Sequence, residues 1–244
     1  MLKKLCLSLV VVICGLIAVL PLGAAGHGEG QKKDDKVAII LASFGTTVPS
    51  AIESIVNIQQ KIQAAFPGVP VKITFTSNII RSVWRERQAD AKKWLDQGVP
   101  EEILYVKNIV YTFGELLEAG YRDIIVQPTH IFFMEEAHDL TQYVNAMRSI
   151  QTIKDKWKPF GKIALGRPAL GTVGPRYDYR EDFKKALMTL SDDVELAHKE
   201  KAALVYMGHG NDHWPSGIYA EAEKMMREMY PQVTTYIGCV EGSP

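Results

Sequence analysis

The sequence lacks any excess of charge of one sign, because its 28 basic residues balance 28 acidic ones. Without a basic excess there is no electrostatic argument for nucleic-acid binding, and without an acidic block there is no sign of a disordered tail. The 244 residues, 47% of them hydrophobic, suit one large or two small globular domains.

Cysteine is scarce as well. Of three cysteines, Cys6 and Cys14 lie in an apolar N-terminal segment, which leaves Cys239 for the rest of the chain. A single cysteine cannot form an internal disulfide, so the fold must depend on its hydrophobic core.

Several familiar motifs are absent. The glycines after the first apolar run match neither G-x-G-x-x-G nor a P-loop with its lysine, which argues against nucleotide binding. There is no G-x-S-x-G nucleophile elbow either. We therefore expect no nucleotide cofactor.

The N-terminus is typical of a signal peptide over residues 1–25. Lys3 and Lys4 precede an uncharged apolar run over 5–22, and small residues follow it. Cleavage after Ala25 predicts an exported, periplasmic protein with a polar linker over 26–36 and no stable membrane insertion. The alternative is an uncleaved anchor, because about 18 apolar residues can span a bilayer.

From residue 37 onward, short apolar runs alternate with helical patterns, which predicts an α/β fold with parallel sheets. The run 37–43 (VAIILAS) is typical of a strand covered on both faces. A helix should begin near Pro49, with Ser50 and Glu53 spaced as in a capping box, and end at Pro67. The other expected strands are 71–75, 124–127, 162–165, 202–207 and 233–238, and the other expected helices include 79–95, 104–119, 137–150 and 180–190.

The opening pattern returns in the second half, where an apolar strand again runs into a glycine-containing turn at 208–210. The first half has four expected strands and the second has two. We interpret the chain as two similar Rossmann-like lobes, 37–178 and 179–244, with the second incomplete. We expect such a chain to bind a metal more weakly than a longer one.

Candidate functional residues follow three of the expected strands. In open α/β sheets, ligands bind beyond the carboxyl ends of the strands. The three sets are 43–47, His130 to Glu136, and His209 with His213. Glycine in the first and third sets would let a ligand approach the backbone, and Gly208 and Gly210 would leave the His209 imidazole uncrowded.

Imidazole together with carboxylate suits divalent metals such as Co²⁺, Ni²⁺, Fe²⁺ or Zn²⁺, so His130 with Glu135 or Glu136 is a candidate site. The alternative is that His130 is a hydrogen-bonded structural residue and that the glutamates cap the next helix. We expect His138 and His198 at the surfaces of helices.

Four segments, taken in order, resemble the anaerobic sirohydrochlorin cobaltochelatases, which are class II tetrapyrrole metal chelatases related to protoporphyrin ferrochelatase. The segments are 43–46 (SFGT), 76–81 (TSNIIR), 207–210 (MGHG) and 240–244 (VEGSP), and the resemblance extends over about 37–244. It implies two similar α/β lobes with the tetrapyrrole between them.

The resemblance also implies roles for individual residues. His209 would be the catalytic residue, acting as proton acceptor and metal ligand, and Glu136 the metal-binding glutamate, with Glu135 as the fallback. A further metal-binding histidine of the family lies in a later Gly-Asp-His-Ala motif, which this chain does not contain. A neutral imidazole can accept a proton or bind a metal at neutral pH.

For substrate binding we expect the strand-end residues Ser43, Gly45, Thr46 and His130. Sirohydrochlorin carries eight carboxylates, so cations should line its site. Arg81 is the main candidate, with Arg85 and Arg87 beside it; the alternative for this trio is an ordinary solvated helix face.

The resemblance thus predicts an ATP-independent insertion of Co²⁺, as substrate metal, into sirohydrochlorin for cobalamin biosynthesis. One alternative is an exported haem or metal carrier on a chelatase scaffold. Another is the same reaction with Fe²⁺ or Ni²⁺, which ligand type does not distinguish from Co²⁺. His209 with His130 and Glu136 favours the enzyme, since a carrier needs no proton acceptor. We expect no nucleic-acid partner, and a homo-oligomer is compatible with this interpretation.

Overall fold

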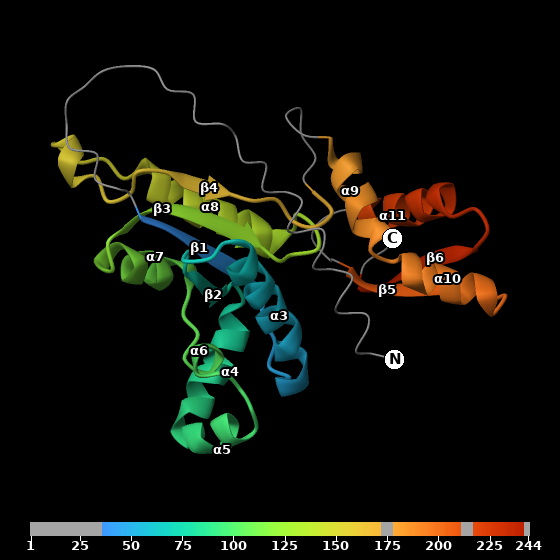
Figure 1. Cartoon of the computed structure of the whole chain (residues 1–244), viewed down its shortest axis with the longest axis horizontal. Helices are drawn as coiled ribbons and strands as arrows, with labels where there is room; N and C mark the ends of the chain where they lie inside the picture. The colour runs from blue at the N-terminus through green and yellow to red at the C-terminus, as the bar shows by residue number, and fades with distance from the viewer. Residues whose placement is uncertain (1–35, 172–177, 211–216, 242–244) are drawn as a thin grey trace. The chain divides into compact units, whose positions relative to one another are not determined.

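A computed structural model describes residues 36–171, 178–210 and 217–241. These residues form two compact units, 36–168 and 169–241. The units divide at Pro168, somewhat before the expected boundary at residue 178. Each unit has a parallel sheet with helices, as the apolar runs predicted (Figure 1).

The first unit is built on four parallel strands in the order β2-β1-β3-β4. They are β1 (Lys36–Ser43), β2 (Val71–Phe75), β3 (Tyr121–Pro128) and β4 (Ile163–Leu165). The central strand β1 is buried from Ala38 to Ser43, which explains why its sequence is a continuous apolar run and does not alternate.

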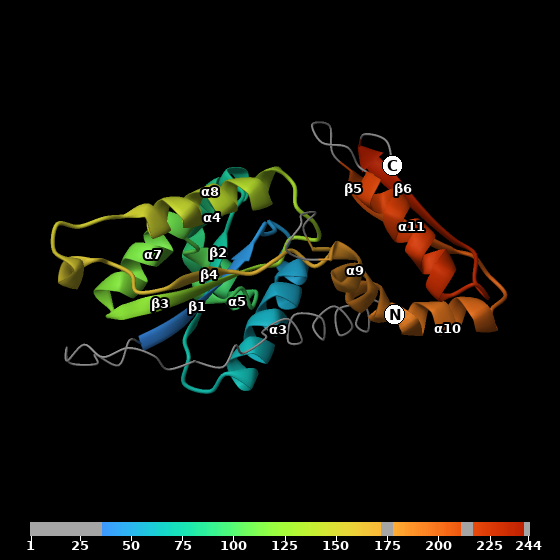
Figure 2. The ribbon, with the colours of Figure 1, turned by 90° about the horizontal axis from the view of Figure 1, so that it is seen from above.

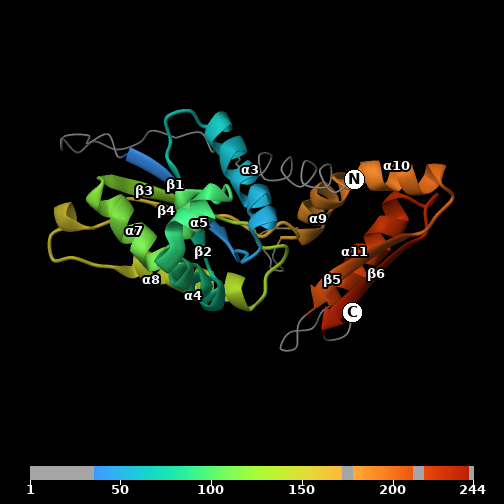
Figure 3. The ribbon, with the colours of Figure 1, turned by 90° about the horizontal axis from the view of Figure 1, so that it is seen from below.

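Helices cover both faces of this sheet, with α7 and α8 on one face and α3 on the other (Figures 2 and 3). The helices of the unit are α3 (Pro49–Ala65), α4 (Asn78–Arg87), η1 (Gln88–Asp90), α5 (Ala91–Asp96), α6 (Glu101–Leu104), α7 (Ile109–Glu118), α8 (Glu135–Ser149) and η2 (Asp155–Trp157). Ala38, Ile40 and Ala42 pack against Phe113 and Leu140 in the core under α7 and α8.

The predicted capping box at the start of α3 is wrong. Val48 holds the cap position without a side-chain hydrogen bond, and Ser50 already lies inside the helix. Pro49 takes the first helical position, where its fixed φ and missing N–H are tolerated, so the helix starts two residues too early for Ser50 to cap it.

The helix predicted over 104–119 is two helices with an extended break between them. The Lys107 carbonyl accepts hydrogen bonds from Thr74 Oγ1 (2.7 Å) and from the Phe75 N–H (3.4 Å), so this segment pairs with the edge of β2. Asn108 then caps α7 by accepting from the Tyr111 N–H at 2.8 Å. The predicted 79–95 helix is likewise divided, into α4, η1 and α5.

The second unit contains α9 (Tyr179–Met188), α10 (Ser191–Lys199), β5 (Leu204–Gly210), α11 (Gly217–Met229) and β6 (Thr235–Glu241). The strands β5 and β6 pair in parallel. Both run about three residues further than predicted, because Gly208 pairs with Cys239 and Gly210 with Glu241. Side chains on one face of β5, from Val205 to His209, are exposed.

Among the described residues, no helix combines the length and the hydrophobicity needed to cross a membrane.

Candidate active site

His209 lies near the carboxyl end of β5, and Glu241 is the last residue of the neighbouring strand β6. Because the two strands are parallel, their carboxyl ends meet at one edge of the sheet. His209 Nε2 lies 3.8 Å from Glu241 Oε2, and the two side chains are 75% and 50% exposed. An imidazole and a carboxylate therefore stand side by side and are open to a ligand.

The separation of these two atoms suits a shared ion better than a direct hydrogen bond. It exceeds the usual hydrogen-bond length of about 3 Å. Two bonds of about 2.1 Å, as histidine and carboxylate form to zinc, can span at most about 4.2 Å. Among the described residues, including this pair, there is no group of three or more histidine, cysteine or acidic side chains that could hold a metal. The pair would thus supply two ligands.

Packing requires the glycines on either side of His209, and their expected role in ligand access stays a prediction. A Cβ on Gly208 would lie 2.3 Å from the Tyr219 ring, and one on Gly210 would lie 1.6 Å from the Glu241 carbonyl oxygen. Gly210 also has a φ of +84°. Tyr219, from α11, accepts a hydrogen bond from the Gly210 N–H at 3.3 Å. These contacts fix the backbone that presents His209.

Glu241 is a candidate ligand that the sequence analysis did not single out. The expected strand 233–238 stops short of Glu241, whereas this residue ends β6 and pairs with Gly210. The parallel arrangement could have indicated Glu241. An acidic residue at the carboxyl end of one parallel strand lies at the same sheet edge as a histidine at the carboxyl end of the neighbouring strand. His213, the other histidine of this set, falls outside the described residues.

In the first unit, the predicted substrate residues Ser43, Gly45 and Thr46 follow β1. Ser43 is buried, and its hydroxyl accepts a hydrogen bond from the Gly45 N–H at 3.3 Å. Gly45 has a φ of +97°, and a Cβ there would lie 2.6 Å from the Phe75 ring. The Thr46 hydroxyl accepts from the Val48 N–H. The conformation of this turn is therefore fixed by its own hydrogen bonds and by its packing against Phe75. Its contact with substrate stays a prediction.

Two residues of α4 hold this turn from outside. Trp84 Nε1 donates to the Thr46 carbonyl at 2.8 Å, and the Arg87 guanidinium donates to the Thr47 carbonyl at 2.7 Å. The guanidinium also lies over the Trp84 and Trp94 rings, 4.4 and 4.2 Å from their centroids. Arg87 is thus neither a free substrate-binding cation nor a solvated side chain.

Arg81 is largely occupied at the end of β2. Its guanidinium donates to the Phe75 and Thr76 carbonyls and to the Asn78 side-chain oxygen. Since a guanidinium has five N–H groups, two are left for a substrate carboxylate. Arg85, further along α4, is exposed.

His130 follows β3 and is held neutral by its surroundings. Its Nε2 lies 3.1 Å from Thr76 Oγ1, while its buried Nδ1 has no hydrogen-bond partner among the described residues. Burial lowers the pKa of His130 from 6.5 to about 4. This matches the structural alternative considered for this residue, and a contact with substrate stays a prediction.

The pKa shift of His130 predicts acid-sensitive stability. Between pH 6.5 and about pH 4, His130 is protonated in the unfolded chain but stays neutral in the folded one. The free energy of unfolding therefore decreases as the pH falls through this interval. At about 1.4 kcal/mol per pKa unit, stability at pH 4.5 should be about 2 kcal/mol lower than at pH 7. His130→Gln should remove that part of the loss in denaturant titrations, whereas His138→Gln should retain it. An equal loss in both variants would contradict the shift.

Glu135 and Glu136 form the first turn of α8, where the helix dipole favours a carboxylate, but Met134 holds the cap position without a side-chain hydrogen bond, so neither glutamate caps the helix. Both line a cavity of about 330 Å³ together with Thr76, Arg81 and Tyr143. Glu136 thus shares a cavity with Arg81 at the carboxyl edge of the sheet, and its role as a metal ligand stays a prediction.

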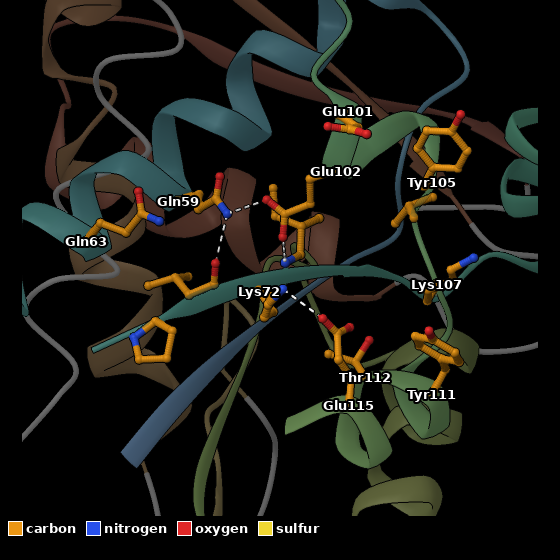
Figure 4. Close-up of a pocket in the computed structure, with 14 residues that line it drawn as sticks. Gln59, Gln63, Lys72, Glu101, Glu102, Tyr105, Lys107, Tyr111, Thr112 and Glu115 are labelled. Atoms are coloured by element: carbon orange, nitrogen blue, oxygen red, sulfur yellow. Dashed lines mark hydrogen bonds and ion pairs between the residues drawn. The ribbon is translucent and has the colours of Figure 1, made fainter. Parts of the chain in front are cut away.

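A cavity of about 660 Å³ lies beside the edge strand β2 of the first unit (Figure 4). Its central polar groups are paired with each other: Gln59 donates to the Val71 carbonyl and to Glu102, and Glu102 accepts from the Ile73 N–H. Lys72 pairs with Glu115 at 2.9 Å. These side chains complete the hydrogen bonding of an exposed strand edge, so we do not assign the active site here.

The predicted surface positions of His138 and His198 agree with the structure. The His138 side chain is 44% exposed on α8, and His198 is exposed on α10. Neither lies among the residues that form the sites above.

The sequence was compared with protein families and with individual known proteins. The sequence model described as cobalt chelatase (CbiK) matches residues 37–244. A protein named sirohydrochlorin cobaltochelatase CbiKC, from Nitratidesulfovibrio vulgaris, is 27% identical over 208 residues, which cover 85% of this chain and 63% of that protein. A sirohydrochlorin cobaltochelatase from Salmonella typhimurium is 26% identical over 212 residues, which cover 86% of this chain and 67% of that protein. The chain thus spans about two thirds of the length of these relatives.

Proposed function

Because the chain belongs to the cobalt chelatase (CbiK) family, we propose that it takes part in the insertion of Co²⁺ into sirohydrochlorin. The observation that carries the proposal is the His209–Glu241 pair, an imidazole and a carboxylate 3.8 Å apart at an exposed strand end. The names of the two relatives support both the metal and the tetrapyrrole.

The reaction forms bonds from the metal to the four ring nitrogens and releases two N–H protons from the macrocycle. The His209 imidazole binds the partly dehydrated ion and, once the ion has moved into the ring, accepts one of the two released protons, while solvent water accepts the other. The Glu241 carboxylate offsets the charge of the ion. Because both side chains are exposed, protons pass from them to solvent. The exchange needs neither a nucleotide nor an oxidant.

For the first unit by itself, the proposed substrate contacts lie at the strand ends. Arg81, with its two remaining N–H groups, would bind a substrate carboxylate. Ser43, Gly45, Thr46 and His130 would line the approach of the macrocycle, and Glu136 is a second candidate for guiding the ion.

The test is an absorbance assay of metal insertion by the full-length protein. Sirohydrochlorin and protoporphyrin are each offered with Co²⁺, Fe²⁺ or Ni²⁺. Co²⁺ with sirohydrochlorin should give the highest kcat/KM, because it is the pair named for the relatives. Faster insertion of Fe²⁺ or Ni²⁺ would change the metal. Tight tetrapyrrole binding without insertion would replace the proposal with a carrier.

We also propose that the protein is exported to the periplasm. The support is the order of Lys3 and Lys4, the apolar run 5–22 and the small residues up to Ala25. N-terminal sequencing of the periplasmic fraction should therefore begin near Gly26. A protein that still starts at Met1 would be anchored and not processed, and one found in the cytoplasmic fraction would not be exported.

A further inference from the structure

The loop over residues 150–162, between α8 and β4, projects two large apolar side chains into solvent. Ile153 is 105% exposed and Trp157 is 67% exposed. No other large apolar side chain of the described residues is as exposed as Ile153. Two large exposed apolar side chains on one short loop mark it as a candidate contact surface.

The tip of the loop is ordered by its own hydrogen bonds. The Thr152 hydroxyl donates to the Lys154 carbonyl at 2.9 Å, and the Trp157 N–H donates to the same carbonyl at 2.9 Å. The Lys158 N–H donates to the Asp155 carbonyl at 3.0 Å, closing the 3₁₀ turn η2. The backbone therefore holds the apolar side chains outward.

The base of the loop is fastened to the body of the first unit. Phe160 is buried, and its ring meets that of Phe113 edge to face, with 5.2 Å between centroids. Arg122, at the start of β3, donates to the Lys158 carbonyl and accepts from the Gly161 N–H through its own carbonyl. The tip thus stands on a fixed base.

Positive charge surrounds the exposed apolar side chains. Residues 150–162 contain four lysines and a single aspartate, in a chain whose formal net charge is zero. Lys154 and Lys156 are exposed at the tip, and the Lys156 ammonium lies 5.2 Å from the Trp157 ring centroid. At the start of β1, the Lys36 ammonium lies 5.8 Å from the Tyr121 ring centroid and adds another cation at this end of the sheet.

This surface is at the amino end of the four-stranded sheet, where β1 begins (Figures 1 and 2). The strand-end residues with proposed substrate contacts lie at the opposite, carboxyl end. A partner bound to the loop would therefore leave that end of the sheet open.

We propose that residues 150–162 rest on an anionic phospholipid surface. Tryptophan favours the interface between headgroups and acyl chains, isoleucine can enter the acyl region, and the lysines pair with lipid phosphates. Two apolar side chains are few for a stable protein interface, which buries about 800 Å² on each partner. The net positive charge of the loop complements an anionic membrane directly. The contact is peripheral and reversible, and it is independent of the proposed activity.

Hydrogen exchange of the full chain, read peptide by peptide, tests this contact locally. Vesicles of phosphatidylglycerol and phosphatidylethanolamine should slow exchange over 150–162, and phosphatidylcholine vesicles should not. Unchanged exchange over 150–162 would overturn the proposal even if the chain bound vesicles through another segment. If exchange over 150–162 slows with increasing protein concentration in the absence of lipid, the loop forms a protein contact, and this result would also overturn the proposal.

Variants separate the contribution of the lysines from that of the apolar side chains in a vesicle co-sedimentation assay. A lysine near an anionic surface strengthens binding by about 1 kcal/mol, or about fivefold. The combined Lys154→Glu and Lys156→Glu variant should therefore lower the partition coefficient of the loop contact by at least about 25-fold and abolish the local slowing of exchange. Ile153→Ser with Trp157→Ser should also abolish it. Lys184→Glu with Lys199→Glu, a matched charge reversal on exposed residues of the second unit, should leave it unchanged. Equal loss in this control would mean that net charge alone is responsible, which would contradict a specific contact.

Discussion

Replacing His209 with alanine should lower the rate of cobalt insertion by at least about 100-fold, the usual scale for losing a positioned acid–base group. The imidazole is 75% exposed and lies 3.8 Å from Glu241, so it is free to meet both the ion and the macrocycle. Its removal deletes a metal ligand and the proposed proton acceptor together. The measurement is the initial rate of the absorbance change with sirohydrochlorin and Co²⁺.

The matched control for this variant is His198→Ala, on the exposed surface of α10 in the same unit. It should keep the wild-type rate. The thermal unfolding of both variants should match that of the wild type, since neither side chain is buried. A His209→Ala protein with near wild-type turnover would remove this residue from the mechanism.

Replacing Glu241 with glutamine should lower insertion at least about tenfold when Co²⁺ is limiting. The change keeps the size of the side chain but removes the negative charge that offsets the ion. Removing a residue that only orients a metal ligand lowers the metal affinity 10- to 100-fold. Glu241 is placed to contact the ion itself. The loss should appear mainly in the KM for Co²⁺.

Glu200→Gln, on an exposed residue that follows α10, is the corresponding control and should leave the KM for Co²⁺ unchanged. An aspartate at position 241 should recover part of the affinity, because it restores the charge at a shorter reach. Glu241→Gln with an unchanged KM for Co²⁺ would show that the carboxylate does not meet the ion.

The strands were predictable because a strand that is buried on both faces appears in the sequence as a continuous run of apolar residues. The runs at 37–43 and 71–75 match β1 and β2 within one residue, and the parallel arrangement followed from the alternation with helices. The break at 105–108 was not predictable from periodicity, since its cause is a tertiary contact. Lys107 pairs with Thr74 across the edge of β2, and this contact overrides the helical pattern.

The candidate site was predictable in part. The strand-end position and the motif both point to His209, and the structure places its imidazole 3.8 Å from Glu241, while its role stays a prediction. Glu241 was not singled out because the expected strand ended at residue 238, and its pairing with Gly210 becomes visible only in the sheet register. Arg87 shows the opposite error: its type suggested substrate carboxylates, but two tryptophan rings and the Thr47 carbonyl occupy it. Charge alone does not reveal whether a cation is already engaged.

The central claim is that His209 and Glu241 act on the same ion in one step, and a double-mutant cycle tests it most directly. Insertion rates are measured for the wild type, His209→Ala, Glu241→Gln and the double variant, at one limiting Co²⁺ concentration. Groups that act as a unit have strongly non-additive effects. We predict that the double variant is about as slow as His209→Ala alone. Losses that multiply in the double variant would show that the two residues act independently, and this would contradict the account.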